Sequence, residues 1–268
     1  MASFFSIFLL TSCGKESPKL TQDEIALNSI LSNRSEIIGD ACFDDEKGSC
    51  QPTKHVFEHV FLPDYPDCDL TVEIMACVID AGFGVEIIAS DYHITNLTSC
   101  PELLGDIADL VLNEETPAGQ LNEFITKIDY QVFTKLEDHF YARFGKNNDC
   151  GQNGGTFVVE YVRTACQSVC LYELIQDDPR GPTGDGDGSR NVKVSGFIKT
   201  PCDTDGCCLR HTDICYDPIH NMLVKTTSSN VIGQDPFKPC EGGLNDLPIL
   251  PTGYKLVSCS PCLVTCDQ

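Results

Sequence analysis

The sequence predicts an α+β protein in which an antiparallel β-sheet is covered by two consecutive helices. Three observations support this fold class. Apolar residues alternate with a period of two after Lys54, follow a helical period between residues 100 and 144, and alternate again after Thr156. The sheet is therefore expected to be completed by strands from both sides of a helical insertion.

The first strands are expected to form an antiparallel meander. Residues 55–62 alternate in part, and residues 70–78 place five apolar side chains on one strand face. The alternation continues at 85–89, after Gly82 and Gly84, which permit the positive backbone angles of a tight connection. We therefore expect three consecutive strands.

Two helices are expected next. Ser99 and Glu102 have the spacing of a capping box, in which each side chain satisfies a free backbone donor at a helix start. A longer helix is expected after Thr116-Pro117, with Gly145 as its stop. Its apolar residues form a stripe broad enough to cover a sheet face: Leu121, Phe124, Ile125, Ile128, Val132, Leu136, Phe140 and Phe144.

The C-terminal half returns to strand patterning. Five further segments read as strands, namely 156–165, 166–174, 192–198, 208–216 and 222–226. Between the second and third of these lies a long polar segment, 176–191, which is expected to be a flexible loop. The tail from Gly233 is rich in Pro, Gly and Cys and is expected to be irregular. Residues 53–268 are predicted to form a single disulfide-stabilised domain.

The charge of the chain is unusual. Its 268 residues include 40 acidic and 18 basic side chains, which gives a net charge of −22. This charge opposes binding to phosphate backbones and to anionic membrane surfaces. Nucleic acid is therefore not expected as a partner. The length of the chain is a separate matter, and it is sufficient to bury a substantial core.

Sulfur is the second unusual feature. Of the 17 cysteines, one lies at position 13 and sixteen are spread over the rest of the chain. An even set at this density indicates disulfides and an oxidising compartment. Sequence alone leaves the connectivity open, although pairing neighbours such as Cys42 with Cys50 would close a small loop at little entropic gain. The disulfide candidates are Cys42, Cys50, Cys68, Cys77, Cys100, Cys150, Cys166, Cys170, Cys202, Cys207, Cys208, Cys215, Cys240, Cys259, Cys262 and Cys266.

Zinc is the alternative use of these sulfur atoms. The crowded set is Cys202, Cys207, Cys208, His211 and Cys215. Its spacing is not that of a standard paired zinc knuckle, and exposed thiolates are oxidised outside the cytosol. Disulfides are therefore the preferred interpretation, and no cofactor is expected beyond a weakly bound calcium ion.

The N-terminus carries a short motif. Leu10-Thr11-Ser12-Cys13 closes an apolar run that begins at Phe4. The tetrad resembles the lipobox of bacterial lipoproteins, although the basic residues that usually precede the apolar run are missing from positions 1–12. The alternatives are a plain secretory signal or an ordinary buried N-terminal segment.

This resemblance implies an address. Residues 1–12 would be the signal peptide and Cys13 the lipidated first residue of the mature protein. Gly14 after the cysteine, in place of Asp, implies delivery to the outer membrane, on its periplasmic or cell-surface face. Residues 13–52 would form a tether with a short helix at about 22–32, where Thr21 and Glu24 have capping-box spacing.

A wider resemblance concerns the mature part. Strand sequence runs into cysteines at Val158–Tyr161 before Cys166 and again at Gly206–Arg210. In this respect the chain is similar to cysteine-rich surface proteins of Gram-negative bacteria that have no assigned activity. The resemblance transfers no catalytic or ligand residues.

Two groups of residues are candidate metal ligands. Asp185, Asp187 and Ser189 occupy the first three ligand positions of a calcium loop, but Arg190 and Gly196 stand where that loop needs Gly and an acidic residue. Weak calcium binding and a plain flexible acidic loop both remain open. On a strand, His55, Phe57 and His59 would share one face, which is consistent with either a metal site or ordinary sheet-face histidines.

The preferred functional hypothesis is a lipid-anchored binding or scaffold protein of the cell envelope, with an envelope protein or glycan as partner. No nucleophile elbow, phosphate loop or dinucleotide fingerprint is present, so no catalytic residue is predicted. One alternative is an exported glycan hydrolase that uses paired carboxylates in a cleft. The other is a calcium-dependent adhesive domain.

Overall fold

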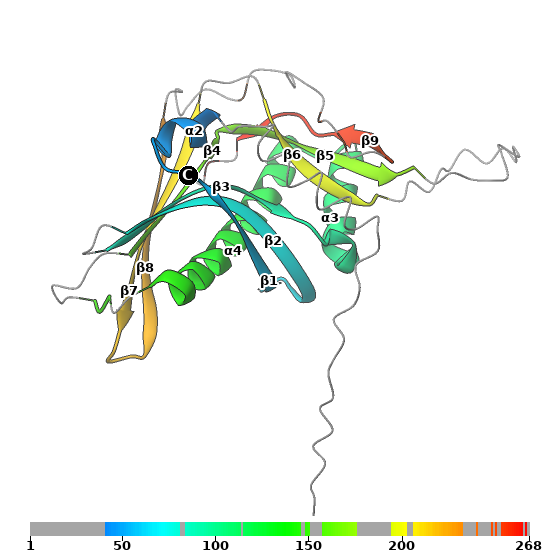
Figure 1. The fold of residues 1–268 in the computed structure, drawn as a ribbon. Coiled ribbons are helices and arrows are strands. Elements are labelled where there is room, and N and C mark those ends of the chain that lie inside the picture. The colour runs from blue at the N-terminus through cyan, green and yellow to red at the C-terminus, as the bar shows by residue number, and fades with distance from the viewer. Residues whose placement is uncertain are drawn as a thin grey trace, which may run out of the picture.

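In the part of the chain that the structure describes, the computed structural model is built around two β-sheets and three α-helices (Figure 1). Its strands are β1 (Thr53–Leu62), β2 (Tyr65–Asp80), β3 (Val85–Ile94), β4 (Phe157–Thr164), β5 (Cys166–Leu174), β6 (Gly196–Pro201), β7 (Cys207–Asp217), β8 (Met222–Ile232), β9 (Tyr254–Cys259) and β10 (Leu263–Val264). Its helices are α2 (Ala41–Glu46), the 3₁₀ turn η1 (Leu97–Ser99), α3 (Pro101–Leu112) and α4 (Ala118–Phe144). The structure describes residues 41–80, 84–113, 115–145, 148–150, 157–175, 194–202, 206–232, 240, 248, 250, 253–264 and 266.

The larger sheet has six strands in the order β1-β2-β3-β4-β7-β8. The predicted antiparallel meander of three strands is confirmed, because β1, β2 and β3 pair in sequence. Strand β4 then pairs with β3 in parallel, and β7 and β8 continue antiparallel. The parallel pair arises because the chain between β3 and β4 passes through two helices, and such a crossover returns it in the same direction.

The smaller sheet is a continuation of the same chain path. Only Ala165 separates β4 in the larger sheet from β5 in the smaller one. Strand β5 pairs with β6 on one edge and with β9 and β10 on the other, all antiparallel. The two sheets are therefore linked through consecutive strands.

The predicted fold class, an antiparallel sheet covered by two consecutive helices, is wrong. Of the described residues, 53% lie in strands and 26% in helices, and the larger sheet is mixed. Helix α4 lies along one face of the larger sheet, whereas α3 packs against α4 and against β5 and β9 of the smaller sheet (Figure 1). Alternation of apolar residues carries no information on strand direction or on how strands divide between two sheets, which explains the error.

The core lies between α4 and the sheets. Residues of α4 at helical spacing, including Ile125, Val132 and Phe140, are almost completely buried. The Phe140 ring packs edge-on against Phe57 of β1, with ring centroids 4.9 Å apart. Phe133 lies in the middle of the helix, with its centroid 4.3 Å from that of Tyr161 on β4.

The other face of the larger sheet is covered by the short helix α2. Phe43 is buried there against Ile88 and Val162. Six residues are too few for a stable isolated helix. Two disulfides hold this segment in place, Cys42–Cys207 to β7 and Cys50–Cys77 to β2.

Disulfides attach the described part of the C-terminal segment to the rest of the molecule. Four disulfides join it to the body of the molecule, namely Cys166–Cys240, Cys170–Cys259, Cys202–Cys262 and Cys208–Cys266. It also supplies β9 and β10 to the smaller sheet. The expectation of an irregular tail is therefore wrong for its described part, where backbone pairing to β5 supplements the crosslinks.

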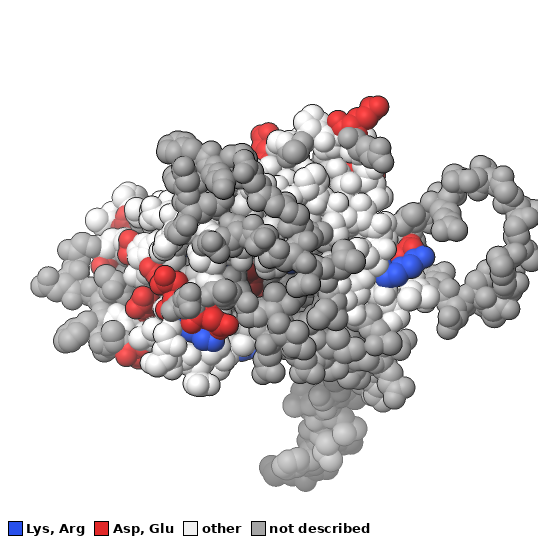
Figure 2. Space-filling model, turned by 90° about the horizontal axis from the view of Figure 1, so that it is seen from above, with Lys and Arg blue, Asp and Glu red and all other residues white. Residues whose placement is uncertain are grey.

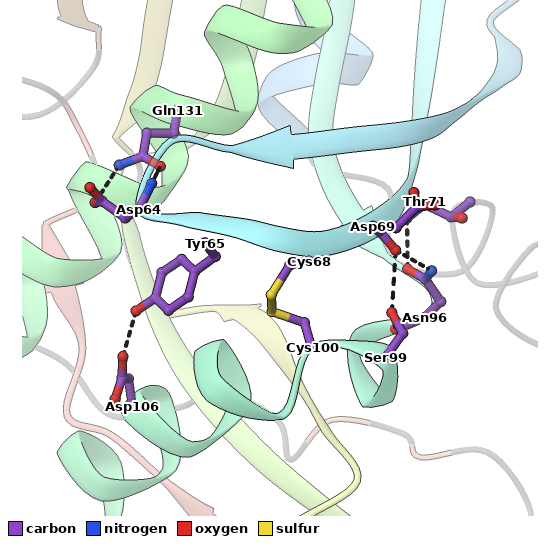
Figure 3. The surroundings of a disulfide bond; sticks show 10 residues. All are labelled: Asp64, Tyr65, Cys68, Asp69, Thr71, Asn96, Ser99, Cys100, Asp106 and Gln131. Atoms are coloured by element: carbon purple, nitrogen blue, oxygen red, sulfur yellow. Dashed lines mark hydrogen bonds between the residues drawn. A yellow bond between two sulfur atoms is a disulfide. The ribbon is translucent and has the colours of Figure 1, made fainter.

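The corner between β2 and α3 combines a disulfide with hydrogen bonds (Figure 3). Cys68–Cys100 joins the two elements, and the Tyr65 hydroxyl donates to Asp106 at 2.6 Å. The predicted capping box is absent, because Cys100 is the N-cap of α3 and makes no side-chain cap bond. The Ser99 hydroxyl instead donates to the backbone carbonyls of Asn96 and Asp69.

The remaining predicted helix boundaries are close to those observed. The longer helix begins at Ala118, directly after Pro117, and ends at Phe144 before Gly145. The short helix expected at 22–32 and the loop expected at 176–191 lie outside the described residues. Among the helices that the structure describes, none is long and apolar enough to cross a membrane.

Replacing both Cys42 and Cys207 with Ala should loosen α2 without disturbing the sheet. A single disulfide typically contributes about 2–4 kcal/mol, and α2 has few other restraints. The amides of Lys47 and Cys50, which bond to carbonyls within this turn, should therefore exchange with solvent at least about tenfold faster. Hydrogen exchange followed by NMR measures this. In the matched control, Cys68→Ala with Cys100→Ala, these amides should keep their wild-type rates, and equal acceleration at every site in the α2 variant would contradict the prediction.

Candidate functional site

The buried face of α4 carries two carboxylates. Asp129 and Glu137 both have an exposed fraction of 0%. They lie eight residues apart with Phe133 midway between them, and a spacing of four places all three on one face of a helix. This face lies against the part of the larger sheet where β4 and β7 contribute Arg163 and Arg210. The helix therefore presents two negative charges to the core, and the guanidinium groups of the sheet pair with them.

Asp129 is the centre of the first half of this network. Arg163 donates to one of its oxygens, and the Tyr92 hydroxyl donates to the other at 2.6 Å. Lys199 of β6 reaches the same oxygen at 3.2 Å and also contacts Asp91 at 2.7 Å. Asp91 accepts a further bond from Gln167 of β5 at 3.0 Å. The network thus joins α4 to both sheets.

These contacts fix the protonation of the buried groups. Burial by itself would raise the pKa of Asp129, but Lys199, Arg163 and the hydrogen bond from Tyr92 outweigh it, so the pKa lies below the usual value. Burial and the adjacent Asp129 raise the pKa of the Tyr92 hydroxyl well above its ordinary value. Asp129 is therefore an anion and Tyr92 a neutral donor across the physiological pH range.

Glu137 is the centre of the second half. It accepts hydrogen bonds from the Thr212 hydroxyl at 2.9 Å and from Arg210 at 3.3 Å. Lys225 of β8 lies 3.2 Å from its other oxygen and 2.8 Å from Asp138. The Phe133 ring separates the two halves, with the Arg163 guanidinium carbon 5.0 Å and the Arg210 carbon 5.9 Å from its centroid.

Among the described residues, the charges of the network balance. Four carboxylates, two of them Asp129 and Glu137, are balanced by four cations. A carboxyl group that acts as a general acid in glycan hydrolysis needs a raised pKa and access to substrate. Asp129 has a lowered pKa and no exposed surface, so this pair of acids does not fit that chemistry. The arrangement is suited to fixing the position of α4.

A second cluster lies on the opposite face of the larger sheet. His211 of β7 contacts Glu160 of β4 through Nδ1 at 2.7 Å and Asp213 through Nε2 at 3.3 Å. Its side chain is 32% exposed. The hydrogen bond that the His211 ring donates to Glu160 and the charge of Asp213 outweigh partial burial, and they raise the pKa of His211 above its usual 6.5. This imidazole therefore gains a proton more readily than a free histidine.

The structure pairs all sixteen cysteines from Cys42 to Cys266 in eight disulfides. Seven of these are named above, and the eighth is Cys150–Cys215. The prediction of a disulfide-bonded chain is confirmed. The cysteines of the zinc alternative lie in four different disulfides, and His211 is bound to carboxylates. This number of disulfides indicates an extracytoplasmic, oxidising location.

The histidines of β1 are not brought together. His55 is buried beside Phe140 and Phe144, where burial, aided by the charge of Arg143, lowers its pKa. His59 has a backbone φ of 60° in an irregular part of the strand, and its exposed ring contacts Asp69 at 2.9 Å. The shared face expected for them is therefore interrupted.

The remaining predicted site residues cannot be placed. Cys13 and the calcium candidates Asp185, Asp187 and Ser189 lie outside the described residues. In the described part of the chain, no three His, Cys, Asp or Glu side chains come together in a way that could hold a metal ion.

Sequence reasoning did not find the ionic network. The apolar stripe predicted for the long helix excludes Asp129 and Glu137, because acidic side chains of an amphipathic helix usually face solvent. Their spacing from Ile125 and Phe133 was the available signal, since residues four apart share a face.

Comparison with known proteins gives no relative. No protein-family model, curated protein or solved structure matches this chain significantly.

Replacing Asp129 with Asn should strongly destabilise the protein. Asn keeps the shape of the side chain but removes the negative charge that Arg163 and Lys199 share at Asp129, and breaking a buried ion pair costs about 3–5 kcal/mol. Urea unfolding with the disulfides intact measures the loss. Asp138→Asn is the matched control on the same helix, since its carboxylate is 47% exposed and should contribute less than about 1 kcal/mol. Equal effects of the two variants would contradict a central role for Asp129.

His211 should titrate above pH 6.5, and Glu160→Gln should lower its pKa. Because the folded pKa is raised, the contact stabilises the fold below pH 6.5 and loses its contribution as the pH rises through the folded pKa. NMR of the imidazole ring protons against pH measures both values. The control is Glu173→Gln on β5, which removes a carboxylate that contacts Lys255 and not His211. This variant should leave the His211 titration curve unchanged. An unchanged curve in Glu160→Gln would contradict the assignment.

Proposed function

We propose that this protein is a lipid-anchored extracytoplasmic protein that binds or scaffolds other components of the cell envelope. The observation that carries the proposal is the set of eight disulfides, which join residues 27 to 165 positions apart. Bonds of this kind persist outside the cytosol. They leave the protein with no free thiol among its described cysteines, and the buried carboxylates are committed to internal ion pairs.

The anchor is proposed from Leu10-Thr11-Ser12-Cys13. In a lipoprotein, Cys13 would carry a diacyl group on sulfur and an acyl group on its amino nitrogen. Each buried methylene contributes about 0.8 kcal/mol, and more than one chain is needed for stable attachment to a membrane. The outer membrane is the proposed destination because Gly14, and not Asp, follows the cysteine.

The surface charge restricts the partners. The net charge is −22, and the face in Figure 2 shows more Asp and Glu than Lys and Arg among the described residues. Such a surface repels phosphate backbones and other polyanions. The proposed partners are therefore neutral or basic envelope proteins or uncharged glycans, and not nucleic acid.

Replacing Cys13 with Ala should convert the protein from a membrane-bound form to a water-soluble one. The full chain is expressed with its own leader in a Gram-negative bacterium and partitioned between detergent and aqueous phases. The wild type should enter the detergent phase, and its intact mass should correspond to a chain that begins at Cys13 and carries acyl groups. Thr11→Ser, which keeps a small residue in the motif, is the control and should behave as the wild type. A wild-type protein with an unmodified N-terminus in the aqueous phase would remove the anchor.

A separate test distinguishes the proposed scaffold from the glycan hydrolase. Purified protein incubated with envelope glycans should leave their chain lengths unchanged in mass spectrometry, because a scaffold binds without cleavage. Shortened glycans would favour the hydrolase over the scaffold.

A further inference from the structure

Strand β8 is an edge of the larger sheet along its full length. All of its eleven residues pair with β7, from Met222 opposite Asp217 to Ile232 opposite Cys207, with no register shift. In the described part of the chain no strand pairs with its other edge. An edge of this length offers a row of backbone donors and acceptors to a further strand.

The opposite edge of the same sheet is protected. Strand β1 has two register irregularities against β2, between Phe57 and Leu62, and its residue His59 has a positive φ. It also carries the exposed charged residues Lys54 and Glu58. Bulges and charges of this kind prevent edge-to-edge association.

Strand β8 lacks these devices. Its sequence contains no Pro and no acidic residue. Its one charged side chain, Lys225, is drawn towards α4, where it contacts Glu137 and Asp138 and donates to the backbone carbonyl of Thr134 at 2.8 Å. The absence of acids is notable in a chain with 40 of them. Of the two edges of this sheet, only β8 is regular and free of negative charge.

The sequence of β8 is complementary to itself in the antiparallel direction at all pairs except Val224 opposite Asn230. With Thr227 on the two-fold axis, apolar Met222 meets apolar Ile232, and Leu223 meets Val231. The polar residues at the centre of one strand face those of the other, since Thr226 lies opposite Ser228. Lys225 lies opposite Ser229, so no two like charges face each other across the pair. Cross-strand pairs of this kind stabilise a sheet.

The apolar ends of β8 are exposed in the monomer. Met222, Val224 and Ile232 are 55%, 38% and 44% exposed, and all three lie on the sheet face opposite α4. In the antiparallel arrangement, Met222 of each copy packs beside Ile232 of the other. Pairing would therefore cover apolar surface at both ends of the contact and satisfy backbone groups between them.

We propose that β8 pairs antiparallel with β8 of a second copy of this chain and extends the six-stranded sheet across a two-fold axis. Matching at the ends and at the centre of this strand favours a second copy over an unrelated strand. Two copies with a net charge of −22 repel each other, and close approach is least costly along an edge without acids. Association therefore strengthens with salt, because screening shortens the repulsion from about 30 Å at about 0.01 M to about 3 Å at about 1 M.

The test uses two variants of the full chain that differ at a single residue. Thr226→Lys with Ser228→Lys places lysines opposite each other at two positions across the axis. Thr226→Glu with Ser228→Lys places opposite charges there. Both sites are exposed and lie outside the ionic network, so both variants are expected to fold. Each chain also carries Cys13→Ser and is exported to an oxidising compartment, so the result does not depend on the proposed lipid anchor.

Sedimentation equilibrium measures the association of each chain at low and high salt, with circular dichroism to verify folding. The parent chain should be a dimer that tightens with salt. The double-lysine variant should dissociate roughly tenfold more readily, and the Glu–Lys variant should restore the dimer. A parent chain that stays monomeric at high salt, or a dimer that the double-lysine variant leaves intact, would overturn the proposal. In the monomeric case, a different protein's strand would be the occupant of this edge.

Discussion

The structure depends on the neutralisation of the two carboxylates that α4 buries, which cations of the two sheets provide. A helix that carries Asp129 and Glu137 into a core can be stable only where cations meet both, since an unpaired buried charge costs several kcal/mol. The cations come from β4, β6, β7 and β8, and so from both sheets. The position of α4 is therefore set by ion pairs of defined geometry in addition to apolar contact, which by itself tolerates sliding.

Six of the eight disulfides hold segments at the margins of the main apolar core, whereas Cys68–Cys100 lies within it. The apolar core extends from α4 to the inner faces of the sheets and includes few residues of α2 or of the C-terminal segment. Two crosslinks hold the α2 region to the larger sheet, and four hold the C-terminal segment. Crosslinks thus extend order to parts that bury little surface, while packing and ion pairs organise the centre. The fold consequently depends on an oxidising environment mainly at its periphery.

Much of the secondary structure could be predicted, and little of the arrangement. Periodicity identified the meander of strands and the helix that ends at Phe144, because local patterns reflect local burial. It could not identify the parallel pairing of β3 with β4, since alternation is the same for either direction. Sixteen cysteines allow very many connectivities, so the partner of Cys42 was beyond the sequence. The ionic network was missed because Asp129 looks like any surface acid until its partners, distant in sequence, are placed beside it.

The internal balance of charge also bears on function. The described part of the α4 network contains equal numbers of cations and anions, so it contributes nothing to the net charge of −22. That excess is available to the exterior, where it keeps the molecules apart and rejects polyanions. Against such a background, a long regular strand without acidic residues is the part of the surface where another protein can approach most closely. The proposed pairing of β8 would bring two copies together along the edge where this repulsion is weakest.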